Sequence, residues 1–345
     1  MATIAFVGCA HIHTPGFVKR LRDRTGFPSS DTQVKYIWDA QAVRAEHTAK
    51  TLGQGEVISN VKKIWKDPQV TGVVIASQTD EHKKLVAAAA KAGKHMFVEK
   101  PLGLSSRDSV AMARTVGASG VKFQTGYFNR SNPAYRFIRQ EIEAGRFGTI
   151  TRAEAWNCHS GALNDWFATK PNEPALDWRW MADPKRAGCG GFGDLGTHLL
   201  DVLMWLLGDV KAVTANIRSV INRYENCDET GQALIQFASG ATGTLTAGWL
   251  DVANPVTLVV AGTQAHAAVI NGQLYYTCKE LGLDGKTPME LPSDLALPHA
   301  FDLFLDSLNG KDVPLVPVHE AASRVAVMEA MYTSSSKGKW VYPRV

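Results

Sequence analysis

The sequence predicts a doubly wound, parallel α/β domain followed by an α+β domain built on a large, mostly antiparallel sheet. The chain has 345 residues, more than one ordinary hydrophobic core holds. Residues 3–126 alternate apolar strand-like runs with helical segments, the pattern of βαβ units in a parallel sheet. From residue 210 onward, strand-like runs follow one another with only turn residues between them, as in antiparallel sheets. We therefore expect one domain over residues 1–126 and a second over residues 127–345.

The first domain is predicted from strands and helices that alternate along the chain. The expected strands are residues 4–8, 34–39, 57–58, 72–76, 95–99 and 122–126, and the expected helices are 40–52, 81–92 and 105–118. The last helix opens with Ser105 three residues before Asp108, which is a capping-box arrangement with the shorter acid. Successive βαβ units of this kind build a Rossmann-like sheet, in which ligands bind beyond the carboxyl ends of the strands.

The turn after the first strand is the expected phosphate loop. It reads Gly8-Cys-Ala10-His11-Ile12-His13 and keeps only the first glycine of the Gly-x-Gly-x-x-Gly pattern. Thr14 as N-cap and Pro15 as first helical residue then predict a helix whose free N–H groups can bind a phosphate. We expect His11 or His13 to lie beside the pyrophosphate or the nicotinamide. A metal site is disfavoured, because the loop offers the two histidines no carboxylate partner.

Asp39 ends the second predicted strand, where an acid accepts hydrogen bonds from the adenosine ribose of NAD. The same carboxylate could equally cap the helix that begins at Ala40, and one side chain can fill both roles. An acid here repels the 2′-phosphate of NADP, and we expect Arg44, one turn later, to be too mobile to offset that repulsion. NAD is therefore predicted over NADP.

Lys100 follows the strand at residues 95–99 and precedes Pro101. Proline biases Lys100 toward an extended backbone at the carboxyl end of that strand. A lysine held there can meet a cofactor on one side and a substrate on the other. Taken alone, the Glu-Lys-Pro tripeptide favours a surface lysine in a loop, and the case for a function depends on the motifs that surround it.

The second half begins with a predicted helix at 132–143, a strand at 149–157 and a long aromatic loop at 158–186 that carries Trp166, Trp178 and Trp180. Its later strands are predicted at residues 210–221, 230–238, 242–250, 256–261 and 267–270, and its closing helices at 300–308 and 319–332.

A glycine-rich segment, residues 188–193, precedes a helix that carries Asp194 and His198. We expect these glycines to let the backbone approach a ligand closely. The two side chains lie one helical turn apart, so the carboxylate can set the tautomer of the imidazole. The alternative is a helix-capping aspartate beside an interior histidine.

These motifs together resemble the Gfo/Idh/MocA family of glucose–fructose oxidoreductases and inositol dehydrogenases. The resemblance covers nearly the whole chain. It rests on Glu99-Lys100-Pro101, on Gly126-Tyr-Phe-Asn-Arg130-x-Asn-Pro133, on Trp178-Arg179-Trp180 and on Gly190-Gly191-x-x-Asp194-x-Gly196-x-His198-x-x-Asp201. The phosphate loop departs from the family pattern, which affects the pose of the pyrophosphate rather than the class of cofactor.

The resemblance implies a nicotinamide-dependent oxidoreductase that acts on a sugar or polyol hydroxyl. His198 would take the hydroxyl proton, Asp194 would orient His198, and Lys100 would stabilise charge on the reacting oxygen. The sequence leaves open whether Lys100 or His198 takes the proton. The expected cofactor contacts are Gly8, Ala10, His11, Ile12, His13, Asp39, Ser77, His82, Glu99 and Lys100. The expected substrate contacts are Tyr127, Arg130, Trp156, His159, Trp178, Asp194 and His198.

Two other functions fit the same motifs: a glycoside-processing enzyme that oxidises its sugar transiently, and a non-catalytic dinucleotide-binding sensor.

The composition of the chain argues against some classes of binding partner. Net charge is only +4 without a basic stripe, so no nucleic acid is expected. No apolar run suits a membrane helix, and no basic leader precedes the first strand. Five scattered cysteines favour reduced thiols in the cytoplasm. We expect a homodimer or homotetramer formed through residues 210–270, because one face of that sheet is left uncovered by helices.

Overall fold

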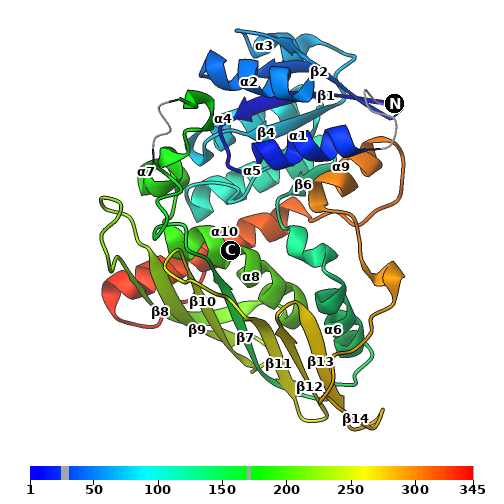
Figure 1. Ribbon diagram of the computed structural model, residues 1–345, viewed down its shortest axis with the longest axis vertical. Coiled ribbons are helices and arrows are strands. Elements are labelled where there is room, and N and C mark those ends of the chain that lie inside the picture. The colour runs from blue at the N-terminus through cyan, green and yellow to red at the C-terminus, as the bar shows by residue number, and fades with distance from the viewer. Residues whose placement is uncertain (25–30, 169–171, 345) are drawn as a thin grey trace. The chain divides into compact units, whose positions relative to one another are not determined.

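The computed structural model describes residues 1–24, 31–168 and 172–344 (Figure 1). They form two compact units. The first comprises Met1–Gly126, Trp166–Gly188 and Pro298–Val325, and the second comprises Tyr127–Asp165, Cys189–Leu297 and Ala326–Val345. The segments Trp166–Gly188 and Pro298–Val325 thus belong to the first unit, whereas the expected first domain is the continuous range 1–126. Residues 169–171 of the predicted aromatic loop lie outside the described residues.

The first unit holds a six-stranded sheet of order β3-β2-β1-β4-β5-β6, in which every paired strand runs parallel. Its strands are β1 (Ala2–Cys9), β2 (Thr32–Trp38), β3 (Glu56–Val57), β4 (Gly72–Ala76), β5 (His95–Val98) and β6 (Phe123–Thr125). Its connecting helices are α1 (Thr14–Asp23), α2 (Ala42–Leu52), α3 (Lys62–Lys66), α4 (Thr79–Lys91) and α5 (Ser106–Ser119). The predicted doubly wound sheet is confirmed.

The starts of α1 and α5 follow the sequence signals to within one residue, whereas α2 and α4 each begin two residues from the predicted start. The Ser105 side chain accepts a hydrogen bond from the Asp108 amide at 3.2 Å, as the capping box predicts. Helix α1 begins at Thr14 with His13 at the N-cap, one residue earlier than predicted. Pro15 therefore lies inside the first turn, where its missing N–H leaves no hydrogen bond unmade.

Helix α9 (Ala300–Leu308) belongs to the first unit because its apolar face is buried there. Phe301 stacks on Phe17 with ring centroids 4.6 Å apart and meets Phe97 edge-on at 5.4 Å. At Gly72 an added Cβ would come within 2.7 Å of a methyl group of Leu308, so this glycine lets the helix approach the sheet closely. A chain segment far from β5 in sequence thus completes the core around Phe17 and Phe97.

The second unit holds an eight-stranded sheet of order β14-β13-β12-β11-β7-β10-β9-β8. Its strands are β7 (Ile150–Cys158), β8 (Val210–Arg218), β9 (Thr230–Phe237), β10 (Thr242–Gly248), β11 (Val256–Gly262), β12 (Ala265–Ile270), β13 (Gln273–Cys278) and β14 (Leu283–Asp284). Only β7 and β10 pair in parallel among these described strands, so the sheet is mostly antiparallel, as predicted.

Strands β13 and β14 were missing from the sequence prediction. The hairpin between β12 and β13 turns at Asn271 and Gly272, whose φ angles are +50° and +77°. Asn-Gly is the preferred pair for a two-residue hairpin, because both residues tolerate positive φ. That dipeptide was a usable signal for β13.

Helices cover one face of the second sheet. Figure 1 shows α8 (Gly191–Leu207) and α6 (Pro133–Glu143) on the same side of it, and α8 packs on β7, β9 and β10. The final helix, α10 (Val318–Lys337), reaches β8 through Ser334, whose hydroxyl accepts from the Ala215 amide at 3.1 Å. Among the described residues, no helix has both the length and the apolar composition to cross a membrane.

Candidate functional site

The phosphate loop of the first unit runs from the end of β1 to the start of α1. Gly8 adopts φ +92°, and an added Cβ would come within 2.5 Å of the Ser77 Cβ. The His11 amide donates to the Ala76 carbonyl at 2.9 Å, which ties the loop to the end of β4. The first glycine of the pattern is therefore kept because β1 and β4 approach too closely there for any side chain.

The loop is also fixed from the aromatic segment. The indole N–H of Trp180 donates to the Ala10 carbonyl at 3.0 Å, and its ring lies 5.9 Å from that of His11. Trp180 is buried. The sequence prediction assigned no role to Trp180, although this residue ends the Trp-Arg-Trp motif on which the resemblance partly rests.

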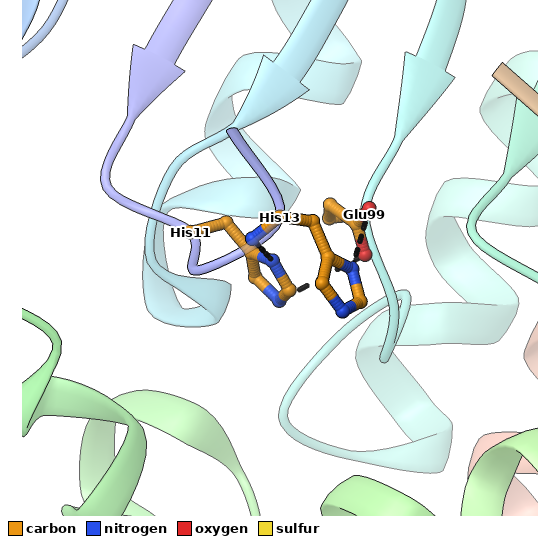
Figure 2. A group of neighbouring side chains, drawn as sticks. All are labelled: His11, His13 and Glu99. Carbon is orange, nitrogen blue, oxygen red and sulfur yellow. Dashed lines mark hydrogen bonds and ion pairs between the residues drawn. The ribbon is translucent and has the colours of Figure 1, made fainter. Parts of the chain in front are cut away.

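His11 and His13 meet a carboxylate that the sequence analysis did not connect with them. His13 Nδ1 donates to Glu99 Oε1 at 3.2 Å, and His11 Nε2 lies 3.8 Å from Glu99 Oε2 (Figure 2). The His13 amide donates to His11 Nδ1 at 3.2 Å, which sets the orientation of the first ring. Parallel strands end at one edge of a sheet, so the end of β5 faces the loop that follows β1. The premise that these histidines lack a carboxylate partner was therefore wrong.

Glu99 is completely buried, which by itself raises the pKa of its carboxyl group. Electrostatic attraction to His11, His13 and Lys100, together with the hydrogen bond from His13, outweighs burial and holds the pKa well below its ordinary value. Glu99 also accepts from the Lys100 amide at 3.0 Å. A Cβ on Gly126 would come within 2.8 Å of Glu99 Oε2, so that position must remain glycine. The protein thus builds a fixed negative charge at the end of β5.

Lys100 is only 2% exposed, and its peptide bond to Pro101 is cis. His82 is fully buried beneath the following segment, and its Nδ1 donates to the Leu102 carbonyl at 3.2 Å. Burial lowers the pKa of His82 and favours a neutral ring. These contacts give His82 a role in fixing the backbone after Lys100. Its expected cofactor contact, like that of the buried Ser77, remains a prediction.

Asp39 ties the ends of two strands together. Its Oδ2 accepts from the Cys9 amide at 2.6 Å and its Oδ1 from the Gln41 amide at 2.8 Å. Helix α2 begins at Ala42 with Gln41 at its N-cap and no side-chain cap, so the expected capping role of Asp39 was wrong and the Gln41 bond instead closes the turn before the helix. Arg44 is buried, with Nη2 donating to the Asp177 carbonyl at 3.0 Å and Nη1 3.9 Å from Asp39 Oδ1. The expectation that Arg44 is mobile was wrong, because the aromatic segment covers it.

In the second unit, the glycine-rich segment leads into α8. At two of its glycines, close packing leaves no room for a side chain. An added Cβ at Gly190 would come within 2.5 Å of the Asp228 carbonyl oxygen, and one at Gly191 within 2.6 Å of the Glu229 carbonyl oxygen. The Asp228 carboxylate accepts from the amides of Gly190 at 3.0 Å and Phe192 at 2.8 Å. The glycines at these two positions therefore let the chain press against residues 228–229, which the predicted close approach to a ligand did not foresee.

Tyr332 completes this support from α10. Its hydroxyl donates to Asp228 Oδ1 at 2.9 Å and accepts from the Gly193 amide at 3.0 Å. Burial raises the pKa of the Asp228 carboxyl group. Burial also raises the pKa of the Tyr332 hydroxyl well above its ordinary value, and the negative charge of Asp228 raises it further. The sequence analysis missed both residues, because nothing local marks a pair so distant in the chain.

Replacing Tyr332 with phenylalanine should lower the free energy of unfolding by about 1–3 kcal/mol, since a buried carboxylate and a buried amide then lose a partner. Urea unfolding followed by circular dichroism measures this change. Tyr342→Phe is the matched control, because Tyr342 is 66% exposed and its variant should unfold like the wild type. Equal stability of Tyr332→Phe and the control would contradict the supporting role.

Asp194 and His198 both lie on α8. Asp194 Oδ2 accepts from the indole N–H of Trp249 at 3.1 Å, and Trp249 is completely buried. His198 is 4% exposed, and its ring centroid lies 4.9 Å from that of Phe128. The carboxylate is therefore held by a tryptophan that the sequence analysis did not identify.

Two predicted substrate contacts, Tyr127 and Arg130, contact residues of α8. The Tyr127 ring lies 6.4 Å from the His198 ring, and its hydroxyl is 3.0 Å from Thr197 Oγ1. Arg130 forms a bidentate ion pair with the buried Asp201, at 2.8 and 2.5 Å. That pair commits two of the guanidinium nitrogens to holding the turn after β6 against α8.

The other predicted substrate contacts are dispersed. Trp156 pairs in register with Thr246 and lines a surface hollow with Thr244 and Thr246, on the sheet face away from α8. Trp178 belongs to the first unit, where it lines a small pocket with Thr14 and Pro15 of α1. His159, just after β7, accepts from the Gly161 amide at 2.9 Å. The structure does not bring Trp156 together with His198.

Comparison with known families matches both parts of the chain. Residues 2–127 match a model described as an oxidoreductase family with an NAD-binding Rossmann fold. Residues 135–268 match the GFO/IDH/MocA C-terminal domain.

Among curated relatives, levoglucosan dehydrogenase of Pseudarthrobacter phenanthrenivorans is 29% identical over 235 residues, which cover 62% of this chain and 58% of that protein. The scyllo-inositol 2-dehydrogenase (NAD(+)) of Bacillus subtilis is 32% identical over 215 residues, covering 61% and 58%. The matched part thus spans a little under three fifths of these relatives. A solved levoglucosan dehydrogenase in complex with NADH superposes with a TM-score of 0.83 at 20% identity, over 99% of both chains. That likeness establishes the fold.

Proposed function

The chain belongs to the GFO/IDH/MocA family, and we propose that it is an NAD-dependent oxidoreductase that removes hydride from a hydroxyl-bearing carbon of a sugar or polyol. The observation that carries the proposal is Lys100, buried at the carboxyl end of β5 in an NAD-binding Rossmann domain. The substrate class is supported by the relatives, which are named as levoglucosan and inositol dehydrogenases.

The proposed chemistry divides the work among three side chains. His198 accepts the proton of the substrate hydroxyl as hydride leaves for the nicotinamide, and Asp194 stabilises the imidazolium that results. Lys100 donates a hydrogen bond to the reacting oxygen and stabilises negative charge developing on it. The bond from Trp249 supports the role of Asp194, because it fixes the carboxylate on α8 without removing its charge.

A panel of inositols, aldoses, anhydrosugars and glycosides, each offered with NAD and with NADP, tests the proposal. Reduced cofactor and sugar products are followed separately. We expect at least one polyol or sugar to yield an oxidised product and reduced NAD in equal amounts. Cleaved glycoside without net reduced cofactor would instead indicate transient oxidation, and cofactor binding without turnover of any compound would indicate a sensor.

We propose NAD over NADP, with the preference set mainly by Asp39. The Asp39 carboxylate accepts hydrogen bonds from two backbone amides, which hold it in place. From this position its negative charge repels a 2′-phosphate. Arg44 is buried, with Nη1 3.9 Å from Asp39 Oδ1 and Nη2 bonded to the Asp177 carbonyl, so it weakens that repulsion without removing the carboxylate from the site. Asp39→Ala should lower the ratio of kcat/KM for NAD over NADP, with little change in kcat. A wild type that favours NADP would refute the assignment.

We propose a homodimer or homotetramer formed through the uncovered face of the second sheet. Leu234 of β9 is 51% exposed on that face, beside Trp156 and Thr244. Leu234→Lys should therefore weaken assembly, measured as the mass of the particle by light scattering at micromolar concentration. Leu281→Lys is the control, since Leu281 is also exposed, at 47%, but lies between β13 and β14. A monomeric wild type would contradict the proposal.

A further inference from the structure

Three side chains with metal-binding chemistry converge at the loop of the first unit. His11, His13 and Glu99 each offer one ligand atom, and these atoms all lie within 4.8 Å of one another (Figure 2). Ligands about 2.0–2.1 Å from a tetrahedral ion are about 3.3 Å apart. Glu99 Oε1 lies 3.2 Å from His13 Nδ1 and Glu99 Oε2 lies 3.8 Å from His11 Nε2, so each carboxylate oxygen is near that spacing from one imidazole nitrogen.

The surrounding backbone holds these ligands in place. The Lys100 amide donates to Glu99 Oε2, and the absence of a side chain at Gly126 leaves room for the carboxylate. The His11 amide donates to the Ala76 carbonyl, so the loop is anchored before an ion arrives. His11 and Glu99 are buried, whereas the His13 side chain is 32% exposed and offers a path of entry. The site is therefore preorganised and accessible from one side.

We propose that His11, His13 and Glu99 bind one divalent d-block cation of the Zn²⁺ class in the nucleotide-free protein. Two imidazoles and a single carboxylate suit Zn²⁺, Co²⁺ or Fe²⁺, whereas Mg²⁺ and Ca²⁺ prefer sites made of oxygen ligands. Three protein ligands leave a further position for water. The buried carboxylate gains a divalent positive charge in place of two imidazole N–H groups.

Ligation requires a change of tautomer at His11. Its Nδ1 now accepts the His13 amide, so the ring proton lies on Nε2, which faces Glu99. An ion bound at Nε2 needs the proton on Nδ1, and the 3.2 Å bond from the His13 amide is then lost. The exchange gives up one 3.2 Å hydrogen bond within the loop and gains a coordination bond. His13 exchanges its Nδ1 proton for the ion in the same way.

Zinc titration of the nucleotide-free, full-length protein against a competing fluorescent chelator tests the site. We expect one Zn²⁺ per chain with micromolar or tighter affinity. His13→Gln and Glu99→Gln should each weaken binding by at least about 10-fold, because each removes a ligand. His47→Gln is the matched control, since His47 is exposed on α2 and its loss should leave the affinity unchanged.

Cobalt substitution separates this site from the five cysteines, all of which are buried. The Co²⁺ protein should show ligand-field bands without a thiolate charge-transfer band, and His13→Gln should abolish those bands. Circular dichroism establishes that each variant is folded. If Glu99→Gln fails to fold, the half-buried His13 variant alone decides the question. Binding weaker than micromolar in the wild type, or equal affinity in wild type and His13→Gln, would overturn the proposal.

Discussion

Replacing Lys100 with methionine should lower kcat by roughly 10²–10⁴-fold, the usual effect of losing one acid–base or electrostatic group. Methionine keeps much of the length and apolar body of the lysine side chain, so the buried position stays filled. What is lost is the charged donor that the mechanism places at the reacting oxygen. Affinity for reduced NAD should change little, because the phosphate loop and Asp39 are untouched. The measurement is kcat on the best substrate of the panel, with the Kd of NADH from fluorescence titration.

Lys91→Met is the matched control, because Lys91 is exposed at the end of α4. Its kcat should equal that of the wild type. If Lys100→Met kept near-normal turnover, the catalytic role of Lys100 would be wrong. If the variant lost NADH affinity and kcat together, Lys100 would be acting mainly through the cofactor site.

Replacing His198 with alanine should also lower kcat by roughly 10²–10⁴-fold, since the hydroxyl proton then loses its acceptor. His198 is nearly buried beside Phe128, so the variant leaves a cavity that free imidazole can enter. Added imidazole should restore part of kcat, which a purely structural role would not explain. The control is His319→Ala, which removes an exposed histidine of α10.

Asp194→Asn should impair turnover similarly, through the orientation of His198. The amide oxygen can still accept from Trp249, but the negative charge that stabilises an imidazolium is gone. Near-normal turnover of His198→Ala would show that the proton leaves by another route.

The sequence was most informative where structure is encoded locally. Apolar runs separated by helical segments predicted the parallel sheet, because strands buried on both faces must be apolar throughout. The Ser105 cap was equally readable, since its partner lies three residues away. Strand β13 was not predicted, although the pair Asn271-Gly272 indicates the hairpin that leads into it. The sequence therefore contained the signal for this strand.

The site was predictable in its residue types and less so in their partners. Lys100 and the loop of His11 and His13 could be placed at the carboxyl edge of the sheet from strand order alone. Glu99 as the partner of both histidines could not, because that contact depends on the register of β5 relative to β1. Asp228 and Tyr332 are further examples, since each supports the start of α8 from a distant part of the chain.

The alternation of side chains along β7 explains why Trp156, a predicted substrate contact, does not lie beside His198. Alternate residues of a strand point to opposite faces, and Ala155 is buried on the side of α8 while Trp156 points to the other. The prediction for Trp156 rested on the ability of its ring to stack on a sugar, and not on the face of the sheet to which it points. Gly190 and Gly191 lie against the backbone of residues 228–229, and their close approach to a ligand stays a prediction. A close approach of backbone to backbone and a close approach of backbone to ligand both demand glycine, and sequence does not distinguish them.

The central claim is direct hydride transfer from a hydroxyl-bearing carbon to NAD, and isotope transfer tests it most directly. The best substrate of the panel is prepared with deuterium on the carbon to be oxidised and incubated with the enzyme and NAD. Mass spectrometry of the reduced cofactor should then show one deuterium per molecule, and kcat/KM should fall relative to the unlabelled substrate if hydride transfer limits the rate. Reduced cofactor without deuterium, or no reduced cofactor with any compound of the panel, would contradict the account.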